Sequence, residues 1–393
     1  MKKYSLEKFK ESKRNKKMIK STIVITIATV ILIIVSLYLA HRGFRSFVDT
    51  YILRKEISEE NASSITIDTE NLSLIYGYDK NLVVYVDGRV DFYNTEAKKI
   101  NSIEISLSKP IADSSGKYLA LGDFGSQKFC LINSNNLVWQ KDIEGKVSKI
   151  GVNKDGYVAL SITGTTYESI VMIFNPKGDL LFSDYLSDYV LDVAISNDNK
   201  YVAIAEIDNS NIIPTTTIQM LSIDKATSGG SKDMDNNAII NVYQAENSDV
   251  LTGMKFQKKD NLMCCFDKYV LKMTSKKSDK IYEISDLTAY VDTNINSGFV
   301  RVDKEKSSVF KSDYRLKVKN NNSEKVYIIE GSIKELATKD NKVALNLGEQ
   351  ALFIKDNCWL SKRYVSKQEI KKVLVTEKIG IIVYKDKISV IKL

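Results

Sequence analysis

The sequence predicts an all-β fold, a β-propeller of four-stranded blades, preceded by one transmembrane helix. Three observations support this prediction. Residues 21–40 contain no charged side chain, short apolar runs separated by turn-forming residues fill the rest of the chain, and a turn-and-strand pattern recurs about every 40 residues. The chain of 393 residues is therefore divided into a tail (1–20), a membrane helix (21–40), a juxtamembrane segment (41–63) and the propeller (64–393).

The tail carries most of the net charge. It holds nine Lys or Arg residues and two Glu residues, whereas the remainder holds 48 basic and 47 acidic side chains. Basic residues beside a spanning helix stay in the cytoplasm, so we expect a cytoplasmic N-terminus and an extracytoplasmic C-terminal domain. Four basic residues oppose this orientation: Arg42, Arg45, Arg54 and Lys55. The nearly neutral domain predicts no nucleic-acid partner.

Residues 21–40 are long enough, at 1.5 Å per residue, to span a hydrocarbon core of about 30 Å. A buried core helix would show a polar face, but the polar side chains here are scattered around the helix. A cleavable signal peptide would be shorter and would have small residues before its cleavage site, whereas Tyr38 lies two positions before Ala40. We therefore expect an uncleaved signal anchor that contacts the lipid bilayer of the cell membrane.

Beyond the anchor, the pattern changes from helical to strand-like. Residues 43–60 have apolar side chains at mostly helical spacing, which predicts a short amphipathic juxtamembrane helix. From Ile65 onward, apolar runs are short and are separated by Asn, Asp, Gly, Lys and Ser, and the whole chain has only three prolines. This pattern is typical of many short strands.

A polar turn followed by a short apolar strand occurs eight times. The clearest copies are residues 114–123, 153–162 and 196–206. The first apolar residues of the eight strands are Leu82, Tyr118, Tyr157, Tyr201, Leu262, Phe299, Val343 and Ile381. Each period contains four short strands, and four-stranded antiparallel units at this spacing are the mark of a β-propeller. We expect eight blades, with seven as the alternative.

The two ends of the domain are expected to close the ring. The last unit supplies three strands, and a spare strand at residues 64–68 opens the domain. We expect this strand to become the outer strand of the last blade, so that no blade edge stays open for aggregation. A polar insertion at residues 225–237 explains the longest interval between repeats, and we expect it to be a surface loop.

Several turns resemble those of known propellers. Gly-Lys-Tyr-Leu-Ala at residues 116–120 and Asp-Gly-Tyr-Val-Ala at residues 155–159 are similar to YVTN and tryptophan-aspartate-repeat (WD40-like) turns, and residues 136–143 are similar to a quinoprotein-type blade. The whole chain resembles bacterial proteins of unknown function that join a basic tail and one membrane helix to such a propeller. The Trp-Asp dipeptide is absent and only Trp139 and Trp359 occur, so the resemblance implies no quinone, and we expect no cofactor.

The search for catalytic residues leaves one kind of candidate, the carboxylates. The one histidine, His41, lies at the membrane boundary, which excludes hydrolase sites that use histidine as the base. Aspartates at strand ends and turns could face the channel, or could bond the backbone within turns. Three or more of them meeting within coordination distance would favour an enzyme, whereas a channel filled with apolar or Lys side chains would oppose it. These candidates are Asp113, Asp123, Asp155, Asp192, Asp198, Asp208, Asp292 and Asp303.

The insertion contains a weak calcium motif at Asp233 and Asp235. An EF-hand loop needs Gly at its sixth position and Glu at its twelfth. Ala238 and Gln244 occupy those positions here. We therefore expect no metal site, and the sequence assigns no catalytic or cofactor-binding residue.

Cysteine and tyrosine residues leave two questions open. Cys264 and Cys265 are adjacent and would point to opposite faces of a strand, so the four cysteines do not have metal-binding spacing. We expect buried free thiols, with a Cys130–Cys358 bridge as the alternative. The 21 tyrosines could form a binding surface on one rim, whereas packing between blades is their commoner use.

These observations favour a binding module rather than an enzyme. We expect a membrane-anchored, extracytoplasmic propeller that binds or scaffolds a protein, peptide or cell-envelope ligand, because loops placed by a rigid scaffold carry recognition. The alternative is an extracytoplasmic carboxylate-dependent enzyme, a hydrolase or lyase, with its site at the propeller channel. A sensor is a third hypothesis, but a tail of twenty residues is too short for a folded output domain.

Overall fold

The computed structural model divides the chain into two units, Met1–Ile57 and Ser58–Leu393. Among the residues of the sequence analysis, Arg42, Arg45, Arg54 and Asp235 lie outside the described residues. The structure describes residues 2–41, 44, 47–53, 55–164, 166–209, 213–228, 233–234, 236–246, 248–305, 313–320 and 323–393.

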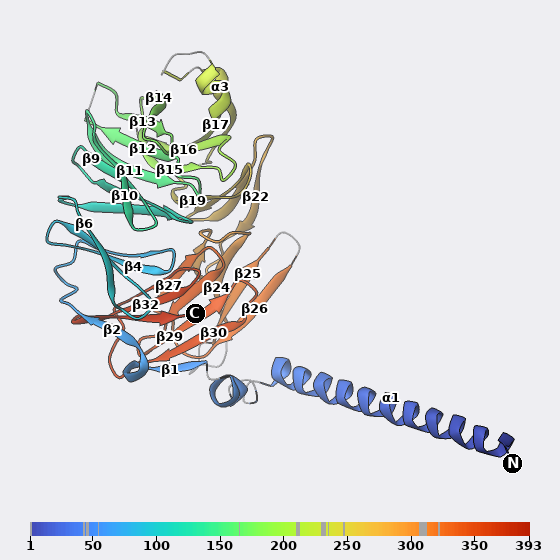
Figure 1. Cartoon of the computed structure of the whole chain (residues 1–393). Helices are drawn as coiled ribbons and strands as arrows, with labels where there is room; N and C mark the ends of the chain where they lie inside the picture. The colour runs from blue at the N-terminus through green and yellow to red at the C-terminus, as the bar shows by residue number, and fades with distance from the viewer. Residues whose placement is uncertain are drawn as a thin grey trace. The chain divides into compact units, whose positions relative to one another are not determined.

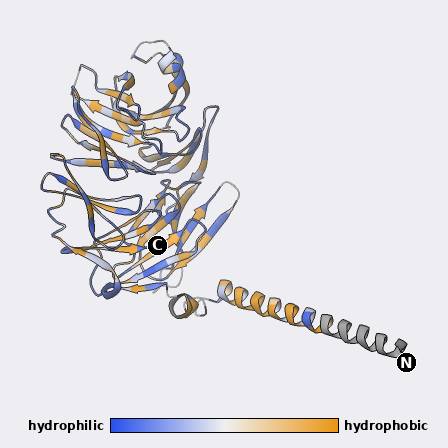
Figure 2. Cartoon of the chain, viewed as in Figure 1, coloured by the Kyte–Doolittle hydropathy of each residue, from blue (hydrophilic) through white to orange (hydrophobic). Residues whose placement is uncertain are grey.

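The first unit is dominated by helix α1 (Lys2–Ala40). Its segment Met18–Ala40 has a mean hydropathy of 2.8 and is long and apolar enough to cross a membrane, and its hydrophobic side chains appear as an orange stretch in Figure 2. Thr22, Thr26 and Thr29 each donate their hydroxyl to the carbonyl oxygen four residues earlier, at 2.9–3.0 Å. These hydroxyls are therefore bonded within the helix, and the prediction of one apolar N-terminal helix is confirmed.

The described part of residues 41–63 contains short helical and extended elements. Asp49 is 5% exposed, accepts a hydrogen bond from the Tyr38 hydroxyl at 2.7 Å and pairs with Lys55 at 2.7 Å. These three side chains hold a short helical turn against the end of α1. The elements here are the π-helix η1 (Val48–Ile52), strand β1 (Glu56–Ser58) and the 3₁₀-helix η2 (Glu59–Asn61).

The second unit is an eight-bladed β-propeller. Its described residues form eight antiparallel sheets, each with four strands from this unit, which follow one another along the chain (Figure 1). The prediction of eight blades is confirmed. Blades 1 and 2 consist of β3 (Leu74–Tyr78), β4 (Asn81–Val86), β5 (Arg89–Tyr93) and β6 (Lys99–Glu104), and of β7 (Pro110–Ser115), β8 (Tyr118–Asp123), β9 (Lys128–Asn133) and β10 (Asn136–Asp142).

The remaining blades have the same order of strands. Blades 3 and 4 consist of β11 (Lys146–Val152), β12 (Val158–Thr163), β13 (Ser169–Phe174) and β14 (Leu180–Leu186), and of β15 (Tyr189–Ile195), β16 (Tyr201–Asp208), β17 (Thr215–Ser222) and β18 (Ile239–Gln244). Blades 5 and 6 consist of β19 (Leu251–Lys258), β20 (Asn261–Phe266), β21 (Tyr269–Met273) and β22 (Ser278–Glu283), and of β23 (Thr288–Asp292), β24 (Phe299–Glu305), β25 (Asp313–Lys319) and β26 (Glu324–Ile329). Blade 7 consists of β27 (Glu335–Lys339), β28 (Lys342–Asn346), β29 (Gln350–Lys355) and β30 (Leu360–Val365), and blade 8 contains β31 (Lys372–Val375), β32 (Ile379–Val383) and β33 (Lys387–Lys392).

The fourth strand of blade 8 comes from the start of the domain. Strand β2 (Ser63–Thr66) pairs antiparallel with β33, with Ile65 opposite Ile388. Figure 1 shows this blue strand beside the red C-terminal strands. The amide of Ile67 extends the pairing by donating to the carbonyl oxygen of Asp386 at 3.0 Å. The predicted closing strand is confirmed, and it begins one residue before the predicted range.

Glu59 of η2 stabilises the junction between β2 and the C-terminal strands, which we call the closing seam. Its carboxylate accepts hydrogen bonds from the Ser366 hydroxyl at 3.0 Å, the Lys367 amide at 2.8 Å and the Gln368 side chain at 3.0 Å, and it pairs with Lys387 of β33. Burial opposes ionisation, but these donors outweigh it and lower the pKa of Glu59 to about 2. The carboxylate thus joins the segment before β2 to blades 7 and 8.

The core lies between neighbouring blades rather than inside any single sheet. The second strands of most blades, such as β4, β12, β28 and β32, are almost fully buried, because the adjacent blades cover both of their faces. Across the seam, Leu82 and Val84 of β4 pack against Ile379 and Ile381 of β32. The eight apolar residues that mark the sequence repeats all lie within two residues of the start of these second strands, so the repeat register is confirmed.

The turn before each second strand explains the recurrent Gly and Asn residues. Gly116, Gly156 and Asn199 have φ values of 56°, 86° and 61° in three successive blades, a conformation that favours these residue types. Gly156 has a second reason to lack a side chain, because an added Cβ would lie 2.6 Å from the Tyr118 ring of the preceding blade.

The described part of the insertion is partly helical rather than a simple loop. Helix α3 (Ile223–Ser228) buries Ile223 and Ala226, which pack in the core between blades 3 and 4. The expectation of a surface loop is therefore wrong for this part, since the apolar side chains three residues apart place one face of a helical turn against the core. The remaining described element is the 3₁₀-helix η3 (Asn236–Ala238).

All four cysteines are free thiols. Cys130, Cys264 and Cys265 are buried in strands and Cys358 is half-buried, as expected for structural thiols. The alternative Cys130–Cys358 bridge is not formed.

A pair of acidic side chains is buried between blades 3 and 4. Asp184 of β14 is 5% exposed and Glu206 of β16 is 4% exposed. The Gln219 side chain donates to Glu206 at 2.7 Å. Burial, together with the nearby Asp184 carboxylate, raises the pKa of Glu206 to about 7, and burial raises the pKa of Asp184 to about 6. These carboxyl groups therefore gain or lose protons near neutral pH.

Candidate functional site

A cavity of about 440 Å³ lies at the centre of the propeller, where the first strands of seven blades end. The first strands of neighbouring blades lie against one another, as β7, β11 and β15 do, so these strands line the channel. The wall of the cavity is predominantly polar and is formed by β3, β7, β11, β15, β19, β23 and β27 with the turns that follow them. The volume is in the range of small-molecule sites.

Two aspartates of the cavity tie neighbouring blades together. Asp113 of β7 accepts a hydrogen bond on Oδ2 from the amide of Val152 in the next blade, at 2.8 Å. Asp192 of β15 accepts one on Oδ2 from the amide of Met254, also in the next blade, at 3.2 Å, and one on Oδ1 from Val193 at 2.9 Å. Each carboxylate therefore stabilises the ring with one oxygen while it lines the cavity.

The pKa values of two cavity aspartates, Asp192 and Asp292, are raised. Burial raises the pKa of Asp192 to about 6, and the neighbouring Asp113 carboxylate acts in the same direction against the backbone hydrogen bonds. Burial also raises the pKa of Asp292, although the amide of Asn294 donates to it at 2.7 Å. Negative charge in this part of the cavity is therefore only partly compensated.

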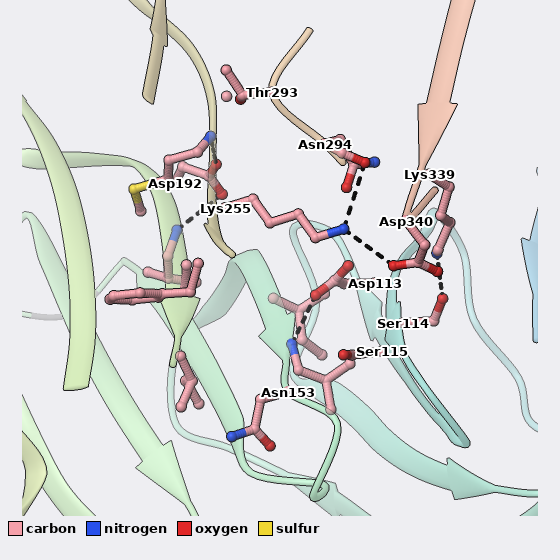
Figure 3. A pocket seen from close by; sticks show the side chains of 18 of the residues that line it. Asp113, Ser114, Ser115, Asn153, Asp192, Lys255, Thr293, Asn294, Lys339 and Asp340 are labelled. Atoms are coloured by element: carbon pink, nitrogen blue, oxygen red, sulfur yellow. Dashed lines mark hydrogen bonds and ion pairs between the residues drawn. The ribbon is translucent and has the colours of Figure 1, made fainter. Parts of the chain in front are cut away.

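Lys255 of β19 extends into the cavity, and its contacts with other described residues are long. Its ammonium lies 3.3 Å from Asp340 Oδ1 and 3.5 Å from the carbonyl oxygen of Asn294 (Figure 3). Burial lowers its pKa, Lys339 lowers it further, and Asp340 opposes both. Charge-assisted hydrogen bonds are usually about 2.7–2.9 Å long, so this ammonium has unused donor capacity.

Lys339 supplies a second ammonium at the end of β27. It donates to the Ser114 hydroxyl at 2.5 Å and to the Tyr76 hydroxyl at 3.1 Å, and it lies 4.7 Å from the centre of the Tyr76 ring. Burial would lower the pKa of Lys339, but Tyr76 and Asp113 outweigh burial and raise it. Within the described part of the chain, this lysine forms no ion pair, so its partners are neutral.

The structure brings three of the eight candidate aspartates to the cavity, namely Asp113, Asp192 and Asp292. Two of the others serve the fold: Asp123 accepts from the amide of Ser108 at 2.9 Å, and Asp303 pairs with Arg301 at 3.0 Å. The candidates outside the cavity lining are Asp123, Asp155, Asp198, Asp208 and Asp303.

The cavity does not have the arrangement expected for a metal-dependent enzyme. Across the described residues, no three His, Cys, Asp or Glu side chains are placed to hold a metal ion. Sequence reasoning missed the two lysines. Lys255 shares one face of β19, the first strand of its blade, with Gly253 and Gln257. A Lys residue in the innermost strand of a blade is the sequence signal that could have identified Lys255 as a cavity residue.

The family of the chain is shown by its sequence. The profile of a family of unknown function (DUF5711) matches residues 53–393. The chain belongs to this family. No curated protein sequence matches the chain significantly.

Solved structures with a similar fold are also propellers. BamB from Moraxella catarrhalis has a TM-score of 0.50 and 10% identity, covering 84% of this chain and 98% of BamB. Sqt1 from Saccharomyces cerevisiae has a TM-score of 0.52 and 9% identity, with coverages of 86% and 99%. AztD from Citrobacter koseri has a TM-score of 0.50 and 10% identity, with coverages of 78% and 87%. At these identities the similarity shows the fold alone.

Proposed function

We propose that this protein is a membrane-anchored binding module that holds its ligand in the cavity at the end of the propeller channel. The observation that carries the proposal is the cavity itself, which receives side chains from seven blades. Its groups combine unused donors on Lys255 with carboxylates that remain partly uncompensated. Convergent polar groups in a concave site of this volume are typical of specific ligand binding.

The proposal includes a single-pass anchor with the propeller outside the cytoplasm. The apolar segment Met18–Ala40 and the nine basic residues of the tail support this orientation. A membrane-impermeant maleimide tests it on the full chain in intact cells. We expect Lys177→Cys, on an exposed turn, to be labelled before lysis and Ser12→Cys only after lysis. The reverse result would overturn the topology, and the wild-type chain gives the background.

Filling the cavity tests the binding function. Gly253 lines the cavity, and a Cβ added to it would have no heavy atom within 4 Å, so Gly253→Phe should occupy the site without a clash. The full chain in lipid nanodiscs would be dialysed against a small-molecule extract of the cell envelope, and retained solutes identified by mass spectrometry. We expect wild type and Gly253→Ala to retain a solute that Gly253→Phe loses at an unchanged melting temperature. Equal retention by all three would place binding outside the cavity.

A further inference from the structure

The end of the ring opposite the cavity carries an acidic group of connections. At this end, connections join the second strand of a blade to its third and the fourth strand to the first strand of the next blade, because the strands alternate in direction. Between β10 and β23, the described residues of the seven such connections include one basic side chain, Lys268, and seven acidic ones. We call these connections the acidic face, and its acidic residues are Glu144, Glu168, Asp188, Glu246, Asp249, Asp267 and Asp286.

Most of these carboxylates lack a counter-charge. Asp249 pairs with Lys268 at 2.5 Å and Glu246 pairs with Lys280 at 3.3 Å, and the other five form no ion pair with a described residue. The remaining connections at this end of the ring hold seven acidic and five basic side chains among their described residues. Negative charge is therefore concentrated on the acidic face and is only partly compensated there.

A buried carboxyl group adds an unsatisfied acceptor beside the acidic face. Asp184 lies near the end of β14 that leads into this face, and it alternates along the strand with Phe182 and Leu186. Those two side chains pack in the core between blades 3 and 4, so Asp184 points into the same interface. Asp184 is 5% exposed, and its Oδ2 has no hydrogen-bond partner among the described residues. A buried acceptor without a donor favours the approach of a positive charge.

Exposed apolar side chains lie among the carboxylates. Tyr185 and Tyr189 flank the connection that contains Asp188, and each is 43% exposed. The ring of Tyr185 lies 4.8 Å, centre to centre, from that of Tyr167, which directly precedes Glu168. The other large apolar side chains exposed on the acidic face are Ile213, Val250 and Leu287. Carboxylates beside aromatic rings suit a Lys or Arg side chain, because both groups attract a cation.

We propose that the acidic face is a docking surface for a basic amphipathic segment of a protein partner. Lys or Arg side chains of the partner would pair with exposed carboxylates such as Glu168 and Asp188, and its apolar side chains would cover the tyrosine rings and Ile213. A second copy that presented the same face, or a membrane surface of anionic lipids, would be repelled by the like charge. This surface lies at the opposite end of the ring from the cavity and does not depend on the ligand of the cavity.

Isothermal titration calorimetry of the full chain in phosphatidylcholine nanodiscs tests this inference, with empty nanodiscs as the reference for binding to lipid. The probes are three acetylated and amidated heptapeptides, one of alternating Lys and Leu, one of alternating Glu and Leu, and one of alternating Lys and Ser. We expect the Lys–Leu peptide to bind at least tenfold more tightly than either of the others, because it alone matches both the charge and the apolar side chains of the acidic face.

Variants locate the binding on the ring. The double variant Glu168→Gln and Asp188→Asn should weaken binding of the Lys–Leu peptide at least fivefold, and Ile213→Ser should weaken it at least threefold. The matched control is the double variant Asp87→Asn and Glu349→Gln, which removes two exposed carboxylates from the same end of the ring but in blades 1 and 7. This control should bind as wild type does.

Melting temperatures near that of wild type would show that the variants fold. Equal binding of the three peptides would overturn the inference, as would equal weakening by the control variant. Self-association of the full chain that Ile213→Ser abolishes would assign the acidic face to a second copy and would also overturn it. Gly253→Phe should leave binding of the Lys–Leu peptide unchanged, and a loss there would place the peptide in the cavity instead.

Discussion

Two glutamates in the same ring show how differently a propeller can use one residue type. Glu59 at the closing seam has four donors and a pKa lowered to about 2. Glu206, between blades 3 and 4, has the single side-chain donor Gln219 and lies near Asp184, and burial raises its pKa to about 7. The number of donors that face a carboxylate and the depth of its burial together decide whether its charge stabilises the fold.

The two side chains should therefore give opposite dependences of stability on pH. The pKa of Glu59 is lowered from 4.5, so its stabilisation is complete above that value and is lost as pH falls toward about 2. The pKa of Glu206 is raised from 4.5 to about 7, so the folded protein loses stability as pH rises through this window. The contribution of the closing seam to stability can thus be distinguished from that of the interface between blades 3 and 4 by their opposite dependences on pH.

Ile67→Pro should have the largest effect, because it breaks the seam at its backbone. The substitution removes the amide that donates to Asp386 and leaves a carbonyl unpaired, and we expect a loss of about 3 kcal/mol of unfolding free energy. Urea denaturation of the full chain in detergent measures it. Ile67→Val keeps the amide and should cost under about 1.5 kcal/mol. Equal midpoints for Ile67→Pro and wild type would show that β2 contributes nothing to closure.

Glu59→Gln should have the next largest effect. It replaces charge-assisted bonds to Lys367 and Lys387 by neutral ones, and we expect a loss of about 1.5–3 kcal/mol at pH 7. The loss should shrink between pH 4.5 and 2, because the wild-type carboxylate becomes protonated there. Glu60→Gln, which removes an exposed ion pair with Lys367, is the matched control and should have no measurable effect. A loss for Glu59→Gln that is constant with pH would contradict the charge-based explanation.

Glu206→Gln should have the smallest effect and the opposite sign. The amide cannot ionise and still accepts from Gln219, so we expect a gain on the order of 1 kcal/mol at pH 8. The gain should disappear near pH 4.5, where the wild-type carboxyl is already neutral. Thermal denaturation across this pH range measures it. Destabilisation at pH 8 would mean that the buried charge is compensated in a way the hydrogen bonds do not show.

The blade count could be predicted from the sequence because each blade repeats a local constraint. The turn before the second strand needs a residue in the left-handed region, as at Gly116, Gly156 and Asn199, and the strand after it must be apolar on both faces because two blades cover it. Both requirements recur in most periods and leave a pattern of residue types. The closing strand β2 could be predicted for a related reason. The last unit of the sequence supplied only three strands, and the strand at the start of the domain belonged to no other unit.

The cavity could not be predicted in the same way, because it depends on which strands are innermost. Asp113 and Asp123 lie in the same hairpin, yet Asp113 is paired with Ala120 and faces the cavity, whereas Asp123 is paired with Pro110 at the opposite end. Residue type and spacing do not distinguish these two positions. Lys255 and Lys339 belong to different blades, so no local sequence pattern predicts that both line the same cavity.

The closing strand also sets an order of events during synthesis. Ile65 and its partner Ile388 are separated by 323 positions, which a ribosome working at about 5–20 residues per second needs roughly 16–65 seconds to add. Throughout that interval β2 has emerged without its partner, and the ring presents open strand edges to other chains. The newly made protein therefore depends on late pairing between its first and last strands, and we expect aggregation between chains to be most frequent before that pairing forms.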